Sequence, residues 1–132
     1  MSENESGINL SISKRKQNFF VVGIGASAGG LRALEEFFEH MSMDSGAAFV
    51  VIQHLSPDFK SLMKELLERR TRMAIYRVTE GMDLQPNSVY LIPPGKNLVL
   101  ENKKLHLLEQ EARSRHGLNF PIDIYLESLA KT

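Results

Sequence analysis

The stretch from Phe19 to Gly30, which reads FFVVGIGASAGG, constrains the fold more than any other part of the 132-residue chain. Its first four residues form an apolar run without polar alternation, which is typical of a strand buried on both faces of a parallel sheet. Glycines then crowd a turn, and the following LRALEEFFEHM places apolar residues at the spacing of one helix face. The stretch therefore predicts a strand over 19–25, a tight turn that holds Ser27, and a helix over 31–43.

A second strand and a second helix follow in the same order. The apolar run AAFVVIQHL at Ala47–Leu55 does not alternate either, and it contains the polar pair Gln53 and His54 near its end. Ser56 as the cap and Pro57 at the first helical position then predict a helix that continues to residue 70. Three arginines near its end suit the negative end of the helix dipole, with contact to a substrate as the alternative: Arg69, Arg70 and Arg72.

The second half of the chain predicts further strands and one more helix. Two strand–helix units in tandem, followed by a third strand, indicate an α/β fold: a mostly parallel, Rossmann-like doubly wound sheet with helices on both faces. A β-hairpin would extend or decorate this sheet. The sequence stops within its last helix, so we expect the fold to be incomplete at the C-terminus. The segments are the strands Ala74–Val78 and Ser88–Ile92, the hairpin strands Asn97–Leu100 and Leu105–Leu108, and the helix from Pro121.

Composition and charge limit where the chain acts and what it binds. Residues 1–18 are polar and predict a disordered tail, whereas residues 19–132 predict one domain. The 16 Lys and Arg balance the 16 Asp and Glu, so no net field favours nucleic acid or anionic lipid. The chain has no cysteine, no secretion signal and no apolar run near the roughly 18 to 20 residues of a membrane span. We therefore expect a cytoplasmic protein that neither binds nucleic acid nor inserts into a membrane.

Two motifs compete for the glycine turn, and the first is the dinucleotide-binding fingerprint. Residues 23–28 (GIGASA) match G-x-G-x-x-[G/A], whose confirming feature is an acidic residue at the end of the second strand. That position holds Gln53 and His54, and the nearest acid beyond them is Asp58. The fingerprint thus loses its main support. Because the absence of cysteine also excludes thiolate sites, we expect no cofactor and no metal.

The second motif is the nucleophile elbow, G-x-S-x-G, which residues 25–29 (GASAG) match. A sharp turn between a strand and a helix lifts the serine hydroxyl clear of the sheet, and the amides of the helix N-terminus can stabilise an oxyanion there. Serine needs a base, and His54 follows the neighbouring strand, whose C-terminal end we expect at the same edge of the sheet. The pattern predicts Ser27 as nucleophile and His54 as base; a small turn residue and a strand-end histidine remain the alternative.

Four segments carry a resemblance over about residues 19–131: VVGIGASAGGLRALEEFF, FVVIQHLSPDFKSLMKELL, TEGMDLQPNSVYLIPPGKNLVL and NFPIDIYLESLAK. They resemble the catalytic domain of the CheB-type protein-glutamate methylesterases of bacterial chemotaxis. The resemblance implies that Ser27 is the nucleophile and His54 its base, and that an acyl-enzyme forms as a glutamyl methyl ester is hydrolysed. It also implies the cytoplasmic domain of a methylated chemoreceptor as the partner. Some members of the family deamidate receptor glutamines as well.

The sequence departs from the pattern of that family in two places. The third catalytic residue of the family is an aspartate in a G-M-G-x-D-G loop downstream of the NFPID segment, and no such loop occurs here. The best-known members also carry a receiver domain ahead of the esterase, so this chain is more similar to the esterase module of hybrid signalling proteins with further domains. We expect low activity from these 132 residues alone, with a non-catalytic receptor-docking module as the alternative. The aspartates that match no catalytic position of the family are Asp44, Asp58, Asp83 and Asp123.

Overall fold

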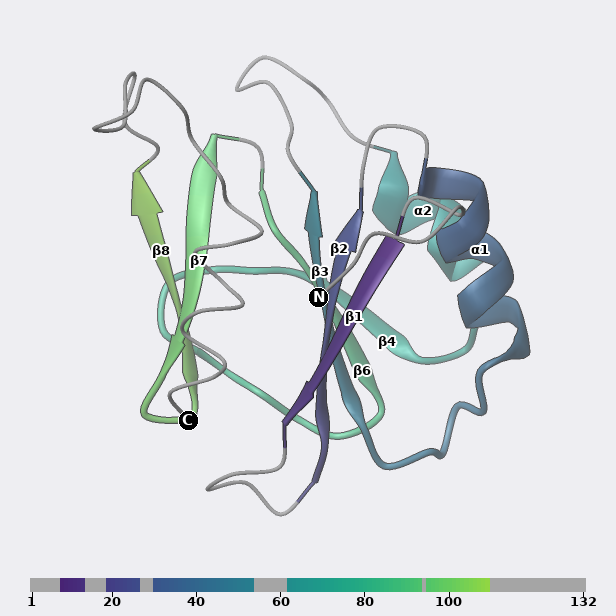
Figure 1. The fold of residues 1–132 in the computed structure, drawn as a ribbon, viewed down its shortest axis with the longest axis horizontal. Helices are drawn as coiled ribbons and strands as arrows, with labels where there is room; N and C mark the ends of the chain where they lie inside the picture. Colours follow the sequence, from purple (N-terminus) through teal and green to yellow (C-terminus); the bar gives the residue numbers. More distant parts are fainter. Residues whose placement is uncertain (1–7, 14–18, 27–29, 54–61, 94, 110–132) are drawn as a thin grey trace.

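A five-stranded sheet forms the centre of the computed structural model, which describes residues 8–13, 19–26, 30–53, 62–93 and 95–109 (Figure 1). Four of its strands run parallel, and the first strand of the chain lies antiparallel at one edge. The mostly parallel sheet confirms the predicted α/β class. In spatial order the strands are β1 (Ile8–Ser13), β2 (Val21–Ala26), β3 (Ala48–Gln53), β6 (Ser88–Leu91) and β4 (Ala74–Arg77).

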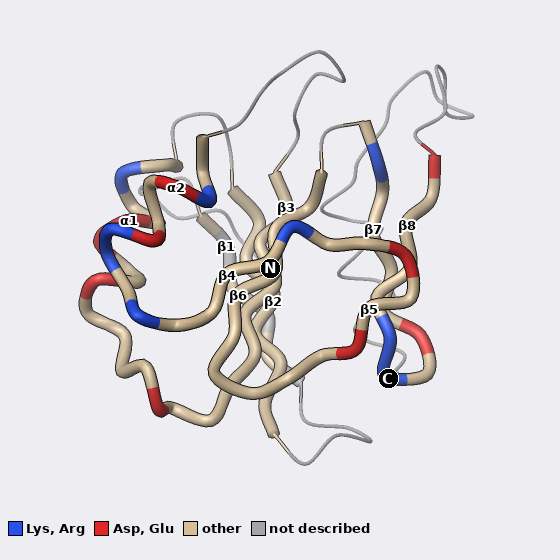
Figure 2. The backbone as a smooth tube through the Cα atoms, turned by 180° about the vertical axis from the view of Figure 1, so that it is seen from behind, with Lys and Arg blue, Asp and Glu red and all other residues tan. Residues whose placement is uncertain are grey.

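Both described helices, α1 (Leu31–His40) and α2 (Met63–Glu68), contribute to the same core on one face of this sheet (Figure 1). Phe38 of α1 packs edge-on against Phe49 of β3, with ring centroids 5.5 Å apart. Figure 2 shows the charged residues over α1, α2 and the outer strands, while the central strands β2, β3 and β6 carry none. The fully or nearly buried helix residues are Leu34, Phe38, Met63 and Leu67.

A second, three-stranded antiparallel sheet covers the opposite face (Figure 1). Its strands bury Leu98 and Leu105 completely, in one core with Val50 and Ile52 of β3. The predicted hairpin is therefore confirmed as a layer across the parallel sheet. The prediction placed helices on both faces; within the described residues the second face carries strands, and the helix expected from Pro121 lies outside the described residues. The strands are, in spatial order, β5 (Met82–Asp83), β8 (Lys104–Glu109) and β7 (Lys96–Glu101).

The first strand corrects the prediction of a disordered tail over residues 1–18. Ile8–Ser13 pairs with all six residues of β2, from Ile8 opposite Ala26 to Ser13 opposite Val21. The physical reason lies in the alternation of Ile8, Leu10 and Ile12 with polar residues, which places three apolar side chains on the face of the sheet that α1 covers. The prediction missed this alternation because it considered only the overall polar composition of residues 1–18. Residues 1–7 and 14–18 lie outside the described residues.

The remaining boundaries agree with the sequence to within a few residues. The first helix ends at His40, before the expected residue 43, because Met41 takes an extended conformation with φ −81° and ψ 131°. The second helix is described from Met63, and its expected start at Pro57 lies outside the described residues. Two residues of positive φ, Asn102 and Lys103, make the hairpin turn. Among the described residues no helix has the length and apolar character to cross a membrane.

Candidate active site

The two predicted catalytic residues follow directly after two strands that are paired in register. β2 and β3 run parallel from Val21 opposite Ala48 to Ala26 opposite Gln53. Ser27 is the next residue after Ala26, and His54 is the next residue after Gln53. Ser27 and His54 themselves lie outside the described residues, so the structure gives the two strand ends that precede them.

Both strands are buried along their whole length, up to this edge of the sheet. All six residues of β2 and all six of β3 are buried, between the helices on one face and the second sheet on the other. Ala26 has no exposed surface, and the polar Gln53 is still only 9% exposed. The ladder of backbone hydrogen bonds thus holds the last residue of each strand at a definite position in the core.

The start of α1 lies close in the chain to the end of β2. Only residues 27–29 separate Ala26 from Gly30, which is buried and forms the N-cap of α1 with φ −88° and ψ 0°. Gly30 has no side chain, and no side-chain hydrogen bond caps this end of the helix. The amides of the first turn and the helix dipole favour a negative charge near this point.

One ion pair lies toward the same edge of the molecule. Lys96, at the start of β7, donates a hydrogen bond to the carboxylate of Glu109, at the end of β8. The two residues are register partners at the end of the hairpin away from its two-residue turn. Lys96 begins β7 five residues after Leu91 ends β6, so the pair follows the C-terminal end of β6 in the chain.

The two described aspartates lie elsewhere. Asp44 accepts a hydrogen bond from Ser42 in the loop that leads into the N-terminal end of β3. Asp83 in β5 binds Lys104 at 2.8 Å, beside the turn of the hairpin. Neither carboxylate lies at the end of the sheet where Ala26 and Gln53 end, and the other two aspartates, Asp58 and Asp123, are outside the described residues. The described part of the chain also contains no group of three His, Cys, Asp or Glu that could hold a metal ion.

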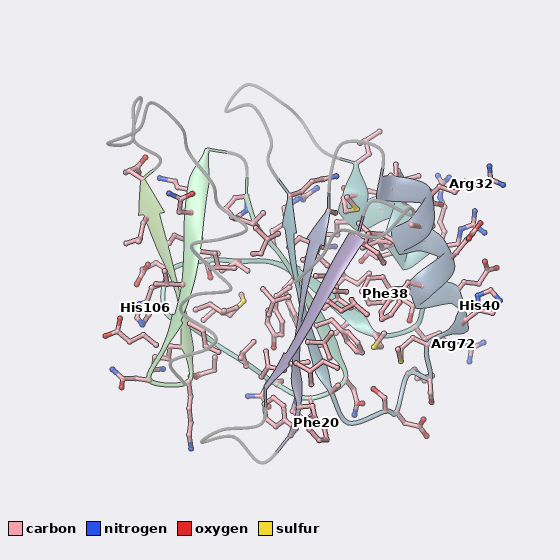
Figure 3. All side chains as sticks on the ribbon, viewed as in Figure 1. Phe20, Arg32, Phe38, His40, Arg72 and His106 are labelled. Atoms are coloured by element: carbon pink, nitrogen blue, oxygen red, sulfur yellow. The ribbon has the colours of Figure 1, made fainter. Side chains whose placement is uncertain are left out.

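The arginines at the end of the second helix do not lie at the candidate site. They precede β4, whose first residue Ala74 pairs with Ser88, and Ser88 in turn pairs with Ala48 at the N-terminal end of β3. Arg70 binds Glu35 of α1 at 3.1 Å and so joins the two helices. Figure 3 shows Arg72 pointing away from the sheet, on the same side as Arg32 and His40. The dipole interpretation is thus favoured over a substrate contact, because these residues lie at the opposite edge.

Comparison with known proteins identifies the family. The model of the family described as CheB methylesterase matches residues 22–132, which is most of the chain. The chain belongs to the CheB methylesterase family. The match begins inside β2 and therefore includes both strand ends and the start of α1.

Known CheB proteins support this family membership along most of the chain. A protein-glutamate methylesterase/protein-glutamine glutaminase of Syntrophomonas wolfei is 30% identical over 129 residues, which cover 93% of the chain and 36% of that protein. One from Xanthomonas oryzae pv. oryzae is 41% identical over 78 residues, covering 59% of the chain and 22% of that protein. The chain thus spans about a third or less of the length of these two relatives.

A solved structure shows the same fold. The CheB methylesterase catalytic domain of Thermotoga maritima superposes with a TM-score of 0.69 at 25% sequence identity. The superposition covers 84% of the chain and 59% of the Thermotoga domain. Its extent confirms the α/β fold of a CheB catalytic domain for most of these residues.

The sequence could not predict the register between the two strand ends. Sequence reasoning required only that neighbouring parallel strands end at one edge, and it left open which residues would face each other. The pairing of Ala26 with Gln53 makes the relation specific to one residue on each strand. The Lys96–Glu109 pair was also missed, although opposite charges at the two ends of a predicted hairpin are a signal for such a pair.

Proposed function

We propose that Ser27 and His54 are the nucleophile and the general base of a protein-glutamate methylesterase that acts on chemoreceptors. Membership of the CheB family supports this activity, since both compared relatives are named for it. The observation that carries the residue assignment is the register of Ala26 with Gln53. We further propose residues 19–132 as the catalytic part, and the cytoplasmic domain of a methylated receptor as the substrate.

Chain geometry supports the proposed pair. Neighbouring strands lie about 4.8 Å apart, and consecutive Cα atoms are about 3.8 Å apart. Ser27 and His54 each lie one residue beyond register partners, so both begin from neighbouring points at the same edge of the sheet. A side-chain hydrogen bond between a serine and a histidine is within reach from such positions.

The first half of the proposed reaction forms an acyl-enzyme. His54 takes the hydroxyl proton of Ser27 as the Ser27 Oγ attacks the ester carbonyl carbon of the methylated glutamate. The uncapped first-turn amides of α1 lie close to Ser27 in the chain and are suited to stabilise the oxyanion. The tetrahedral intermediate then collapses: the ester C–O bond breaks, and His54 gives its proton to the leaving methoxide, which departs as methanol.

The second half restores the enzyme. His54 takes a proton from water, and the hydroxide attacks the acyl carbonyl carbon. The bond to Ser27 Oγ breaks and His54 returns the proton to Oγ. The glutamic acid side chain left on the receptor then ionises to a carboxylate and gives its proton to water. The same steps with glutamine as the substrate release ammonia, which accounts for deamidation by one pair of residues. We expect the carboxylate that orients His54 to be neither Asp44 nor Asp83, because both lie away from the strand ends.

A fluorophosphonate probe tests the assignment on the complete protein as it occurs in the cell. The probe should label Ser27, and Ser27→Ala or His54→Ala should abolish labelling and lower methanol release from a methylated receptor domain at least about 1000-fold. Matched controls are Ser42→Ala and His40→Ala, which change an exposed serine and an exposed histidine far from the strand ends. They should leave labelling and methanol release within about twofold of wild type.

Three outcomes would contradict the proposal. Labelling that persists in Ser27→Ala would place the nucleophile elsewhere. Receptor binding without any labelling or methanol release would instead indicate a non-catalytic docking module. A nicotinamide cofactor that raised the melting temperature would revive the dinucleotide-binding alternative.

A further inference from the structure

Gln53 is a buried polar residue at the last position of β3. It is only 9% exposed and pairs with Ala26 of β2, which has no exposed surface. Successive residues of a strand point to opposite faces, so Gln53 shares the face of Phe49 and Val51, on which α1 packs. A carboxamide that is removed from water costs free energy unless it forms hydrogen bonds. The end of β3 thus requires a hydrogen-bonding partner on the helix side of the sheet.

The start of α1 lies level with Gln53 on that face. Figure 1 shows α1 running back along the sheet from the end of β2, and Phe38 near its end packs against Phe49 near the start of β3, with ring centroids 5.5 Å apart. Gly30 precedes Phe38 by eight residues, which is about 12 Å of helix. Gln53 follows Phe49 by four residues, which is about 13 Å of strand. The N-cap of α1 and Gln53 are therefore at the same height along β3.

The first turn of α1 supplies hydrogen-bond donors at this height. The first backbone amides of a helix have no carbonyl partner within the helix. Gly30, the N-cap, is buried and has no side chain with which to accept a hydrogen bond from them. The carbonyl oxygen of a glutamine is an acceptor, so its chemistry matches these amides. A buried acceptor and the donors of a helix start thus lie level on one face of the sheet.

We propose that Gln53 is a positioning residue of the proposed active site, whose Oε1 accepts a hydrogen bond from a first-turn amide of α1, directly or through one buried water. This bond fixes the start of α1 against the last residue of β3. The proposed base, His54, follows Gln53 in the chain, and the first-turn amides are the groups proposed to stabilise the oxyanion. A displacement of about 1 Å between such groups lowers turnover by about 100-fold. The role of Gln53 rests on the function proposed above and acts through the helix rather than on the substrate.

Hydrogen exchange tests this bond without reference to activity. In the complete protein, one amide within residues 31–33 should exchange slowly. In Gln53→Met it should exchange at least about tenfold faster, because methionine is of similar size but offers no carbonyl oxygen. Gln53→Glu keeps an acceptor, which the positive end of the helix favours, and should leave exchange within about threefold of wild type. Equal exchange of these amides in wild type and Gln53→Met would overturn the proposal.

Turnover gives a second readout. Methanol release from a methylated receptor domain should show a kcat lowered about 10- to 100-fold in Gln53→Met and a KM within about threefold, because the oxyanion forms only in the transition state. Gln53→Glu should recover kcat to within about fivefold of wild type. Leu91→Met is the matched control, since Leu91 ends the neighbouring strand β6, is 5% exposed and lies in the core that α1 covers. It should leave kcat, KM and the exchange of amides 31–33 within about twofold of wild type.

The possible outcomes separate the role of Gln53 from the function on which it rests. A wild-type protein whose Ser27 is not labelled by the fluorophosphonate probe contradicts the proposed function, and the exchange of amides 31–33 still decides whether Gln53 holds α1. Labelled wild type with an unchanged kcat in Gln53→Met contradicts the role of Gln53 alone. Equal losses in Gln53→Glu and Gln53→Met would also overturn it, because the acceptor would then not be the cause. Gln53→Leu, which lacks an acceptor too, should behave like Gln53→Met and replaces it if circular dichroism shows that the methionine variant does not fold.

Discussion

Glu80 is a single residue that joins two segments distant in the sequence. Its Oε2 accepts a hydrogen bond from His106 Nδ1 at 2.7 Å, and its Oε1 accepts one from the backbone amide of Leu107 at 2.7 Å. The hydrogen bond from His106 lowers the pKa of Glu80 below the ordinary 4.5, and the same bond raises the pKa of His106 above 6.5. Figure 3 shows His106 on the outer side of the second sheet, where solvent screens the pair.

We expect the His106–Glu80 pair to make a pH-dependent contribution to the unfolding free energy. The lowered pKa of Glu80 stabilises the fold above pH 4.5, and this contribution is lost as the pH falls through the folded-state pKa. The raised pKa of His106 stabilises the fold below pH 6.5, and this contribution is lost as the pH rises through its folded-state pKa. The pair therefore contributes most between these two values.

Urea unfolding of His106→Gln checks this prediction. The difference in unfolding free energy from wild type should be larger at about pH 5.5 than at about pH 8.5. His40→Gln is the control, because His40 Nδ1 contacts the backbone carbonyl of Glu36 at 2.8 Å and no carboxylate among the described residues. A penalty for His106→Gln that stays equal at both pH values would show that the ion pair does not form.

At the scale of the element, the hairpin turn stores strain at one position. Asn102 and Lys103 have φ of 54° and 64°, the left-handed conformation that a two-residue turn between antiparallel strands needs. Asparagine tolerates this conformation, whereas lysine does so at a cost of about 1 kcal/mol or more. The Asn-Lys pair therefore stands where Asn-Gly would be free of strain.

Glycine at this position should stabilise the protein. We expect Lys103→Gly to raise the unfolding free energy by about 0.5–1 kcal/mol, because glycine adopts positive φ without steric cost. Lys104→Gly is the matched control: Lys104 lies in β8 and binds Asp83 at 2.8 Å, so this change should lower stability by about 1 kcal/mol. Denaturant unfolding at neutral pH measures both, and a loss of stability in Lys103→Gly would refute the strain argument.

Sequence patterns predicted some of the strands and missed others. The two unalternating apolar runs predicted β2 and β3, because a strand that is buried on both faces has apolar residues at successive positions. The hairpin strands were predicted from their apolar runs around a polar turn. β5, with only Met82 and Asp83, was missed because two residues carry no periodicity. β1 was missed because its three apolar residues lie within a polar tail.

At the scale of the whole molecule, the five-stranded sheet has a hydrophobic core on each of its two faces. One core lies under the helices, and the other lies between the two sheets. Sequence patterns could not predict that the second sheet packs across a face of the first, because the contact of Leu98 and Leu105 with β3 joins residues about fifty positions apart. For the candidate site, the sequence predicted both residues and their common edge, while the register came from the structure.

This layering predicts a gradient of protection across the sheet. β3 pairs with β2 and β6 and is covered on both faces, whereas β1 and β4 lie at the two ends of the sheet. Hydrogen exchange at low protein concentration should therefore be slowest at Val50 and Val51 and faster in β1 by at least about 100-fold. Equal protection of β1 and β3 would show that the edge strand opens only with the whole fold.

Because Ala26 pairs with Gln53, a change in the length of a strand and a change in the length of a loop would affect the proposed site differently. The loop of residues 41–47 lies outside the ladder, so residues can be gained or lost there while the two strand ends stay level. A single deletion inside β3 would turn every later side chain of the strand to the other face and move the proposed base away from the proposed nucleophile. If Ser27 and His54 act as proposed, the length of each strand therefore fixes where the two residues begin, while the length of the loop at 41–47 does not.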